Sequence, residues 1–190
     1  MGYDSAFLDA SMKSEALAHR CRDIRLILSD VDGVLTDGTV LLFPDGREAK
    51  SFHIRDGLGI VLAHRAGLRT GLVSGRRSEA VVRRASELGM AIVLQGIEDK
   101  GAALREILAG EHVQPHEVAY MGDDVSDLPV MTEVGLSAAP ADAPMEVRNA
   151  AFMITTAAGG KGCLREFIEA ILKARGDWER VIAKMNGVTA

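Results

Sequence analysis

Residues 24–33 read Ile-Arg-Leu-Ile-Leu-Ser-Asp-Val-Asp-Gly, a short apolar run that stops abruptly at two aspartates and a glycine. A short apolar run that ends at turn-forming residues is typical of a buried parallel strand that leads into a loop. This stretch therefore predicts the first strand of a sheet, with a polar loop at its carboxyl end.

Five further strand-like runs follow, separated by stretches rich in helix-forming residues. They cover residues 68–73, 91–94, 118–121, 136–138 and 152–155. Between them, Ser78 and Asp99 are candidate helix N-caps, and Gly89 and Gly110 are candidate helix ends. The repeated order of strand and helix predicts an α/β fold, a doubly wound parallel sheet covered by helices on both faces.

One segment interrupts this alternation. Residues 39–43 and 47–54 read as two strands joined by the tight turn Pro44-Asp45-Gly46, and we expect a projecting β-hairpin there. The first arm contains Val40-Leu41-Leu42-Phe43, which is apolar without alternation. Because an exposed apolar edge invites association, we expect another copy of the chain to cover it.

The bulk properties indicate one domain and a small-molecule partner. A chain of 190 residues is long enough to bury one core, which we place at residues 24–174, after a helical lead-in (1–23) and before a C-terminal tail (175–190). The net charge of -5, with both signs scattered along the chain, provides no basic stripe for nucleic acid or an anionic membrane.

The cysteines and the apolar segments favour a cytoplasmic location. Cys21 and Cys163 are isolated and lack zinc-ligand spacing, which argues against a disulfide framework and a zinc site. No segment reads as a signal peptide or as a membrane span. We therefore expect a protein of a reducing compartment.

Polar motifs follow three of the predicted strands, where the ligand crevice of a doubly wound sheet lies. They are Asp30-Val31-Asp32-Gly33, Ser74-Gly75-Arg76 and Gly122-Asp123-Asp124-Val125-Ser126-Asp127. Asp30 and Asp123 follow strands that could be neighbours, and together they offer the oxygen ligands that Mg²⁺ prefers. Such a cation would offset the negative charge by which a phosphate monoester repels a nucleophile.

These residue types suit hydrolysis of a phosphate monoester in two steps. Asp30 can attack phosphorus and form an aspartyl-phosphate. Asp32 can protonate the leaving oxygen and later deprotonate water. Ser74 can donate to a phosphoryl oxygen, and Lys100 can pair with the nucleophile and with the developing charge. We therefore predict these four residues to be catalytic.

Four motifs in chain order resemble those of the haloacid dehalogenase phosphatase superfamily. They are residues 30–38, Ser74-Gly75-Arg76, Asp99-Lys100 and Gly122-Asp123-Asp124. Within this superfamily, residues 55–60, 141–144 and 159–162 resemble the phosphatases of 3-deoxy-D-manno-octulosonate 8-phosphate. This similarity extends over about residues 24–174. The resemblance implies a Rossmann-like sheet of that superfamily's type and a role in lipopolysaccharide biosynthesis.

The resemblance also implies particular site residues. The magnesium ligands would be the side chains of Asp30 and Asp123 and the backbone carbonyl of Asp32. Asp124 and Asp127 would lie beside the metal or cap the next helix. The residues implied to contact substrate are Asp32, His53, Ile54, Arg55, Asp56, Gly57, Gly75, Arg76, Arg84 and Lys100.

The resemblance further implies the assembly and the substrate. Larger relatives carry a cap domain, whereas here only the hairpin fills the first interval, and capless relatives form homotetramers in which a neighbour's hairpin and tail close the site. Arg76 suits an acidic sugar's carboxylate. Relatives of the sialic-acid type tend to have glutamate there. A phosphatase of a nine-carbon keto-sugar acid 9-phosphate, or a catalytically silent binding protein of the same fold, stay as alternatives.

Overall fold

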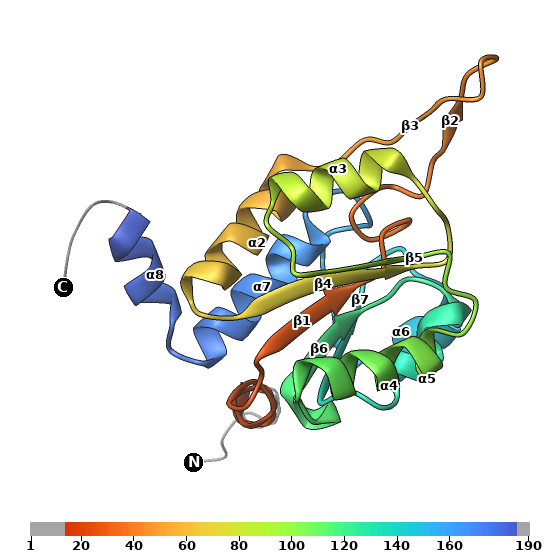
Figure 1. Cartoon of the computed structure of the whole chain (residues 1–190). Helices are drawn as coiled ribbons and strands as arrows, with labels where there is room; N and C mark the ends of the chain where they lie inside the picture. Colours follow the sequence, from red (N-terminus) through yellow and green to blue (C-terminus); the bar gives the residue numbers. More distant parts are fainter. Residues whose placement is uncertain (1–13, 186–190) are drawn as a thin grey trace, which may run out of the picture.

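The computed structural model describes residues 14–185, and its centre is a six-stranded sheet in which all the strands run parallel. The strand order is β5-β4-β1-β6-β7-β8 (Figure 1). The strands are β1 (Leu26–Ser29), β4 (Arg69–Ser74), β5 (Ile92–Gln95), β6 (Val118–Met121), β7 (Leu136–Ala139) and β8 (Met153–Ile154). The predicted doubly wound sheet is confirmed, and each predicted strand is present.

Helices cover both faces of the sheet, as predicted (Figure 1). One face carries α2 (Ile54–Arg65), α3 (Glu79–Glu87) and α7 (Cys163–Ala174). The other face carries α4 (Lys100–Glu111), α5 (Leu128–Met131) and α6 (Met145–Ala150), with the short 3-10 helices η1 (Pro115–Glu117) and η2 (Val125–Asp127) in the connecting segments. Two separate apolar clusters result, one on each face.

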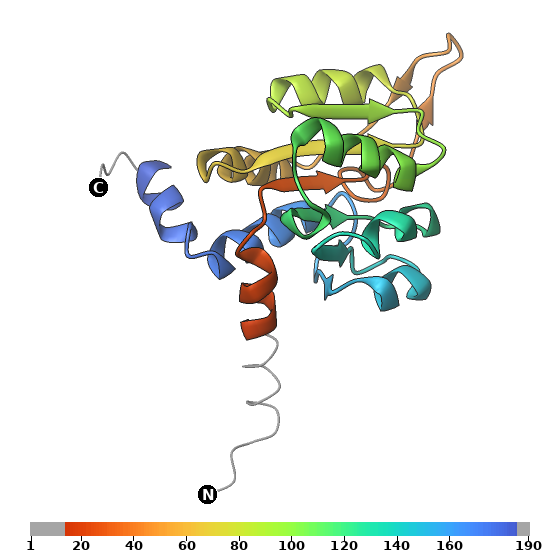
Figure 2. The same cartoon turned by 60° about the horizontal axis from the view of Figure 1, so that its bottom comes forward.

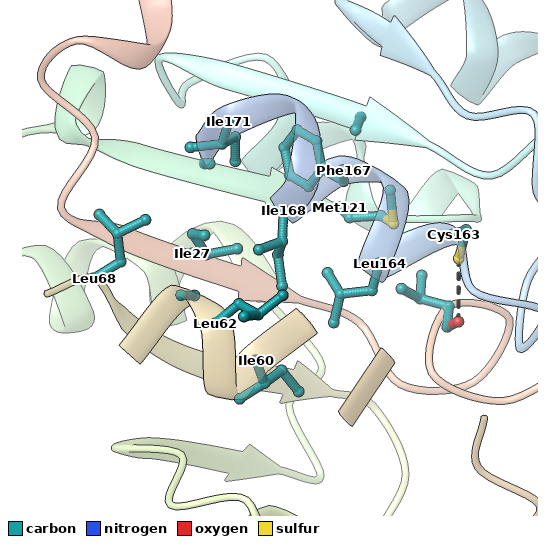
Figure 3. Packing of buried hydrophobic residues seen from close by; sticks show 14 of the residues in the cluster. Ile27, Ile60, Leu62, Leu68, Met121, Cys163, Leu164, Phe167, Ile168 and Ile171 are labelled. Carbon is teal, nitrogen blue, oxygen red and sulfur yellow. Dashed lines mark hydrogen bonds between the residues drawn. The ribbon is translucent and has the colours of Figure 1, made fainter. Parts of the chain in front are cut away.

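The alternation of β1 explains how one strand serves both clusters. Ile27 packs with α2 and α7, whereas Leu26 and Leu28 pack with α4, because successive side chains of a strand point to opposite faces. The matching face of α7 presents Leu164, Phe167, Ile168 and Ile171 at helical spacing, and all four are buried against the sheet (Figure 3). These contacts fix β1, whose carboxyl end carries the first polar loop.

The helix ends were predicted with mixed success. The Asp99 side chain accepts a hydrogen bond from the backbone N–H of Ala102 (2.8 Å), which confirms the N-cap of α4. Ser78 occupies the N-cap position of α3 without a side-chain cap bond. Gly89 follows α3 with φ +67°, but Gly110 does not end α4, which continues to Glu111 and ends at left-handed His112 (φ 54°).

The hairpin consists of β2 (Leu41–Leu42) and β3 (Glu48–Ala49) and projects at the end of the sheet where the strands terminate (Figures 1 and 2). Leu41 and Leu42 are 61% and 75% exposed. The prediction that its second arm reaches residue 54 was wrong. Ile54 begins α2, because the His53 side chain accepts from the backbone N–H of Arg55 (3.3 Å) and caps the helix.

The terminal segments lie only partly within the described residues. Residues 14–21 are helical, and α8 (Trp178–Met185) buries Val181 in the cluster beside α7. The rest of the predicted lead-in (1–13) and of the tail (186–190) lies outside the described residues. Among the helices of residues 14–185, none has the length and apolar character needed to cross a membrane.

Candidate active site

The site is built where two neighbouring strands end. Asp30 follows β1 and Asp123 comes two residues after the end of β6, and these strands pair in register from Leu26 opposite Val118. The backbone N–H of Asp30 donates to the carbonyl of Met121 (2.9 Å), which continues the pairing to the edge of the site. As a result, carboxylate oxygens of Asp30, Asp123 and Asp127 lie within 4.8 Å of one another.

These carboxylates are hard to ionise together. Burial raises the pKa of Asp30 to about 6, although the attraction of Lys100 opposes that rise. Burial, with repulsion from Asp30 and then Asp127, raises the pKa of Asp123 to about 8. Both shifts have the same main cause: burial disfavours the ionised carboxylates, and the positive charge of Lys100 only partly offsets that effect.

Two buried oxygens of the cluster fit a divalent cation. Within residues 14–185, Oδ1 of Asp30 and Oδ1 of Asp123 are buried and have no hydrogen-bond partner. An unpaired buried carboxylate oxygen is costly, and a hard cation with oxygen ligands would satisfy both atoms. Because the cluster itself is made of aspartates, with neither cysteine nor histidine, its chemistry suits Mg²⁺ better than zinc.

Lys100 sits between two of the acids and is only 4% exposed. Its Nζ lies 3.1 Å from Oδ2 of Asp30 and 2.6 Å from Oδ1 of Asp127. Burial tends to lower the pKa of Lys100, but the attraction of the two carboxylates outweighs it and raises the pKa. The lysine therefore stays charged beside the predicted nucleophile.

Asp127 holds the loop and the lysine together. The Tyr120 hydroxyl donates to Oδ1 of Asp127 (2.5 Å), and Oδ2 accepts from the backbone N–H groups of Asp123 (3.0 Å) and Asp124 (3.2 Å). The sequence suggested two roles for Asp127, a position beside the other carboxylates and a cap of the next helix. Its side chain has both roles in the structure. The part played by Tyr120 was not predicted, because a tyrosine in an apolar strand reads as core.

Asp32 lies among basic side chains. Its Oδ1 accepts from Nζ of Lys50 and from the Thr36 hydroxyl (3.4 Å), and Nε of Arg76 lies 3.8 Å from its Oδ2. Arg76 also reaches Oε2 of Glu48 (3.4 Å). Glu48 and Lys50 were missed from the sequence. Their spacing of two, which puts both on one face of the hairpin arm, is the signal that could have found them.

Ser74 is the last residue of β4 and Gly75 follows it, on the other side of β1 from Asp123. Ser74 is buried, and its hydroxyl oxygen accepts from the backbone N–H of Arg76 (3.3 Å). This bond leaves the hydroxyl hydrogen free to donate, as the predicted phosphate contact requires. Gly75 is exposed beside it.

The structure places the other predicted substrate residues at the start of α2 and on α3. Ile54 and Arg55 are exposed, and Gly57 packs closely against the guanidinium of Arg84. Asp56 is buried, its pKa is raised by burial, and it accepts from the backbone N–H of Arg165 (2.7 Å) at the start of α7. Within residues 14–185, no hydrogen bond or ion pair joins His53, Ile54, Arg55, Asp56, Gly57 or Arg84 to the carboxylate cluster, so their substrate contacts stay predictions.

Gly33 allows the two loops to meet, and its replacement tests the site. A Cβ on Gly33 would lie 2.0 Å from Oδ2 of Asp123, and the backbone has φ +91°. We expect Gly33→Ala to displace the Asp123 carboxylate, which should weaken Mg²⁺ binding in calorimetry and lower the predicted phosphatase activity by about 100-fold or more.

Gly67→Ala is the matched control for this substitution. Gly67 has a similar φ of +86°, but nothing lies within 4 Å of its added Cβ. Gly67→Ala should lower the free energy of unfolding by the same backbone cost, about 1–2 kcal/mol, while activity is retained. Equal losses of activity in the two variants would contradict the proposed closeness of the loops.

The chain is similar to known hydrolases and phosphatases. The family of haloacid dehalogenase-like hydrolases matches residues 81–166. The 3-deoxy-D-manno-octulosonate 8-phosphate phosphatase of Yersinia pestis is 39% identical over 93% of this chain and 95% of its own length. The Escherichia coli K12 protein of the same name is 40% identical over 83% of this chain and 84% of its own length.

Solved structures show the same fold. The probable phosphatase of Pseudomonas syringae pv. phaseolica 1448a is 44% identical and superposes with a TM-score of 0.88, over 90% of this chain and 97% of that one. The Moraxella catarrhalis 3-deoxy-D-manno-octulosonate 8-phosphate phosphatase, in complex with magnesium, phosphate and the sugar, is 35% identical with a TM-score of 0.87, over 89% and 97% of the chains. From this identity along nearly the whole chain, and from the site at the ends of β1 and β6, the protein is a phosphatase that belongs to the 3-deoxy-D-manno-octulosonate 8-phosphate phosphatase family of the haloacid dehalogenase-like hydrolases.

Proposed function

We propose that this phosphatase hydrolyses 3-deoxy-D-manno-octulosonate 8-phosphate with Mg²⁺, through a phosphoaspartate on Asp30. The observation that carries the proposal is the buried carboxylate of Asp30, which has one oxygen 3.1 Å from Lys100 and the other without a hydrogen-bond partner in the described part of the chain. The names of the relatives, and the magnesium and sugar bound by the Moraxella catarrhalis protein, support the substrate and the metal.

The roles of the residues follow from their places. Asp30, Asp123 and the backbone carbonyl of Asp32 would hold Mg²⁺, which when bound supplies positive charge against the phosphoryl oxygens. Asp30 attacks phosphorus, the bond from phosphorus to the sugar oxygen breaks, and Asp32 gives that oxygen a proton. Water then attacks the aspartyl-phosphate and loses a proton to Asp32, which releases phosphate and regenerates Asp30.

Lys100 and Ser74 stabilise the negative charges of the nucleophile and the phosphoryl group during both steps. Lys100 stays paired with Asp30 before attack and faces the charge that develops on the phosphoryl group. The buried Ser74 hydroxyl has its hydrogen available for a phosphoryl oxygen. Both groups are already fixed before substrate binds, because Asp127 holds the lysine and a backbone N–H holds the hydroxyl oxygen.

Arg76 is proposed to select the acidic sugar. Its side chain is 53% exposed beside Asp32 and Glu48, so the guanidinium can reach a ligand at the mouth of the site. A charged carboxylate on the sugar would bind there with two hydrogen bonds. The test is a phosphate-release screen with eight-carbon and nine-carbon keto-sugar acid phosphates, in which we expect the eight-carbon substrate to be preferred.

We expect Arg76→Glu to lower kcat/KM for the eight-carbon substrate by roughly 100-fold, because the new carboxylate repels that of the sugar. The matched control is Arg77→Glu, which makes the same charge change at a neighbour whose side chain lies against Gly96. Arg77→Glu should keep wild-type kcat/KM. An unchanged kcat/KM for Arg76→Glu would remove the basis for the eight-carbon assignment.

The proposed assembly is a homotetramer, and the proposed location is the cytoplasm. Leu41, Leu42 and Phe43 form an exposed apolar arm that a second copy would cover. Cys21 and Cys163 are both buried free thiols, which fits a reducing compartment. Light scattering over a range of concentrations tests the assembly, and a monomer with full activity at all concentrations would overturn it.

A further inference from the structure

The hairpin contributes a buried lysine to the active site. Lys50 directly follows β3, and its side chain has no exposed surface. Its Nζ forms an ion pair with Oδ1 of Asp32, whose side chain is 18% exposed. A lysine of a projecting hairpin would ordinarily extend into water, so its burial here requires an explanation.

Burial of this ammonium group is tolerated because it is paired. Removing a charge from water is strongly unfavourable unless an opposite charge and hydrogen bonds compensate it. Asp32 is the ion-pair partner of Lys50 among the described residues, and Glu48 of the same arm adds a weaker attraction. The position of Lys50 therefore depends on the Asp32 carboxylate, and that of the carboxylate on Lys50.

The contacts of Asp32 are divided between its two oxygens. Oδ1 accepts from both Lys50 and the Thr36 hydroxyl, which lies 3.4 Å away. Oδ2 is buried and accepts no hydrogen bond from residues 14–185, and Arg76 approaches it only to 3.8 Å. One oxygen is thus anchored, and the other is left available to exchange a proton.

We infer that Lys50 is a positioning residue that anchors Oδ1 of Asp32, so that Oδ2 faces the ester oxygen during leaving-group departure. This inference rests on the proposed function, in which Asp32 is the acid. The bond from Asp30 to phosphorus forms, the bond from phosphorus to the sugar oxygen breaks, and the proton passes from Asp32 to that oxygen. The hairpin then serves catalysis within its own chain, in addition to any part in assembly.

The experiment compares kcat/KM for two substrates whose leaving groups differ in their need for a proton. The eight-carbon sugar phosphate releases an alkoxide and needs the acid, whereas p-nitrophenyl phosphate releases a stabilised phenolate and does not. Since kcat/KM reports on steps up to leaving-group departure, it isolates the acid role of Asp32. We expect Lys50→Met to lower kcat/KM by about 100-fold on the sugar phosphate and by less than about 10-fold on p-nitrophenyl phosphate.

Three companion variants make the result decisive. Lys173→Met makes the same change at an ion-paired lysine near the far end of α7 and should leave both values of kcat/KM unchanged. Lys50→Gln removes the charge but keeps a donor, so it supplies the same comparison if Lys50→Met fails to fold. Asp32→Asn sets the scale, because it removes the acid itself and should show the largest difference between the two substrates.

The outcomes separate this inference from the proposed function. If kcat/KM of the Lys50 variants falls equally on both substrates, Lys50 acts on folding or on phosphate binding, and the inference is overturned. If Asp32→Asn distinguishes the substrates and the Lys50 variants do not, the inference alone is wrong. If kcat/KM of Asp32→Asn also falls equally on both substrates, Asp32 is not the acid, and the proposed mechanism is overturned together with the inference.

Discussion

Asp30→Asn is expected to abolish phosphate release, with a loss of roughly 10⁴-fold or more, while the metal-free protein becomes more stable. Activity is lost because the amide cannot attack phosphorus. Stability rises because burial, which outweighs the attraction of Lys100, raises the pKa of Asp30 to about 6 and makes its ionised form unfavourable. The gain in the free energy of unfolding at neutral pH should be roughly 3 kcal/mol, measured by urea denaturation in EDTA.

The pH dependence and the response to Mg²⁺ provide the controls for Asp30→Asn. With their pKa raised to about 6 and about 8, folded Asp30 and Asp123 hold protons that the unfolded chain releases from about pH 4 upward. Stability of the metal-free wild type should therefore fall as pH rises from about 4 to about 8, and less steeply in Asp30→Asn. Added Mg²⁺ should stabilise the wild type more than the variant. A variant less stable than the wild type in EDTA would contradict the electrostatic account.

Lys100→Met is expected to cause the second large effect, a loss of both activity and stability. The substitution removes the cation that lies 3.1 Å from Asp30 and 2.6 Å from Asp127 and leaves buried carboxylates without a positive partner. Breaking such a pair costs about 3–5 kcal/mol, and the loss of the group facing the developing charge should lower kcat by about 10³-fold. Urea denaturation and steady-state kinetics measure the two losses.

A double variant separates the two roles of Lys100. Lys100→Met combined with Asp127→Asn removes the lysine together with one of its partners, so much of the lost stability should return. Activity should stay low, because the cation beside Asp30 is still missing. If the double variant regains activity along with stability, Lys100 acts only by holding the fold.

The sequence predicts those parts of the molecule that depend on local pattern. The apolar run before Asp30 and the matching run of β6 identify two buried strands. Parallel strands place their carboxyl ends at one edge, which is why the two aspartates could be expected together. The hairpin arms were harder to delimit, because the boundary at Ile54 depends on a cap made by the His53 side chain.

Residues whose roles depend on tertiary packing were not predictable in the same way. Whether Lys50 points toward solvent or toward Asp32 is decided by how the hairpin arm lies against the first loop. Tyr120 acquires its hydrogen bond only when the loop after β6 returns Asp127 to the strand. Asp56 matches a motif linked to substrate, yet the fold directs its carboxylate to the N-terminus of α7, where backbone N–H groups favour negative charge.

Chemical trapping shows whether the Asp30 carboxylate becomes phosphorylated during turnover. The wild-type enzyme is mixed with substrate and Mg²⁺, quenched rapidly in acid and reduced with borohydride, which converts an aspartyl-phosphate into homoserine. Peptide mass spectrometry should find homoserine at position 30, and none there in Asp30→Asn or without substrate. Homoserine at another aspartate, or a full burst of released phosphate with residue 30 unmodified, would contradict the account.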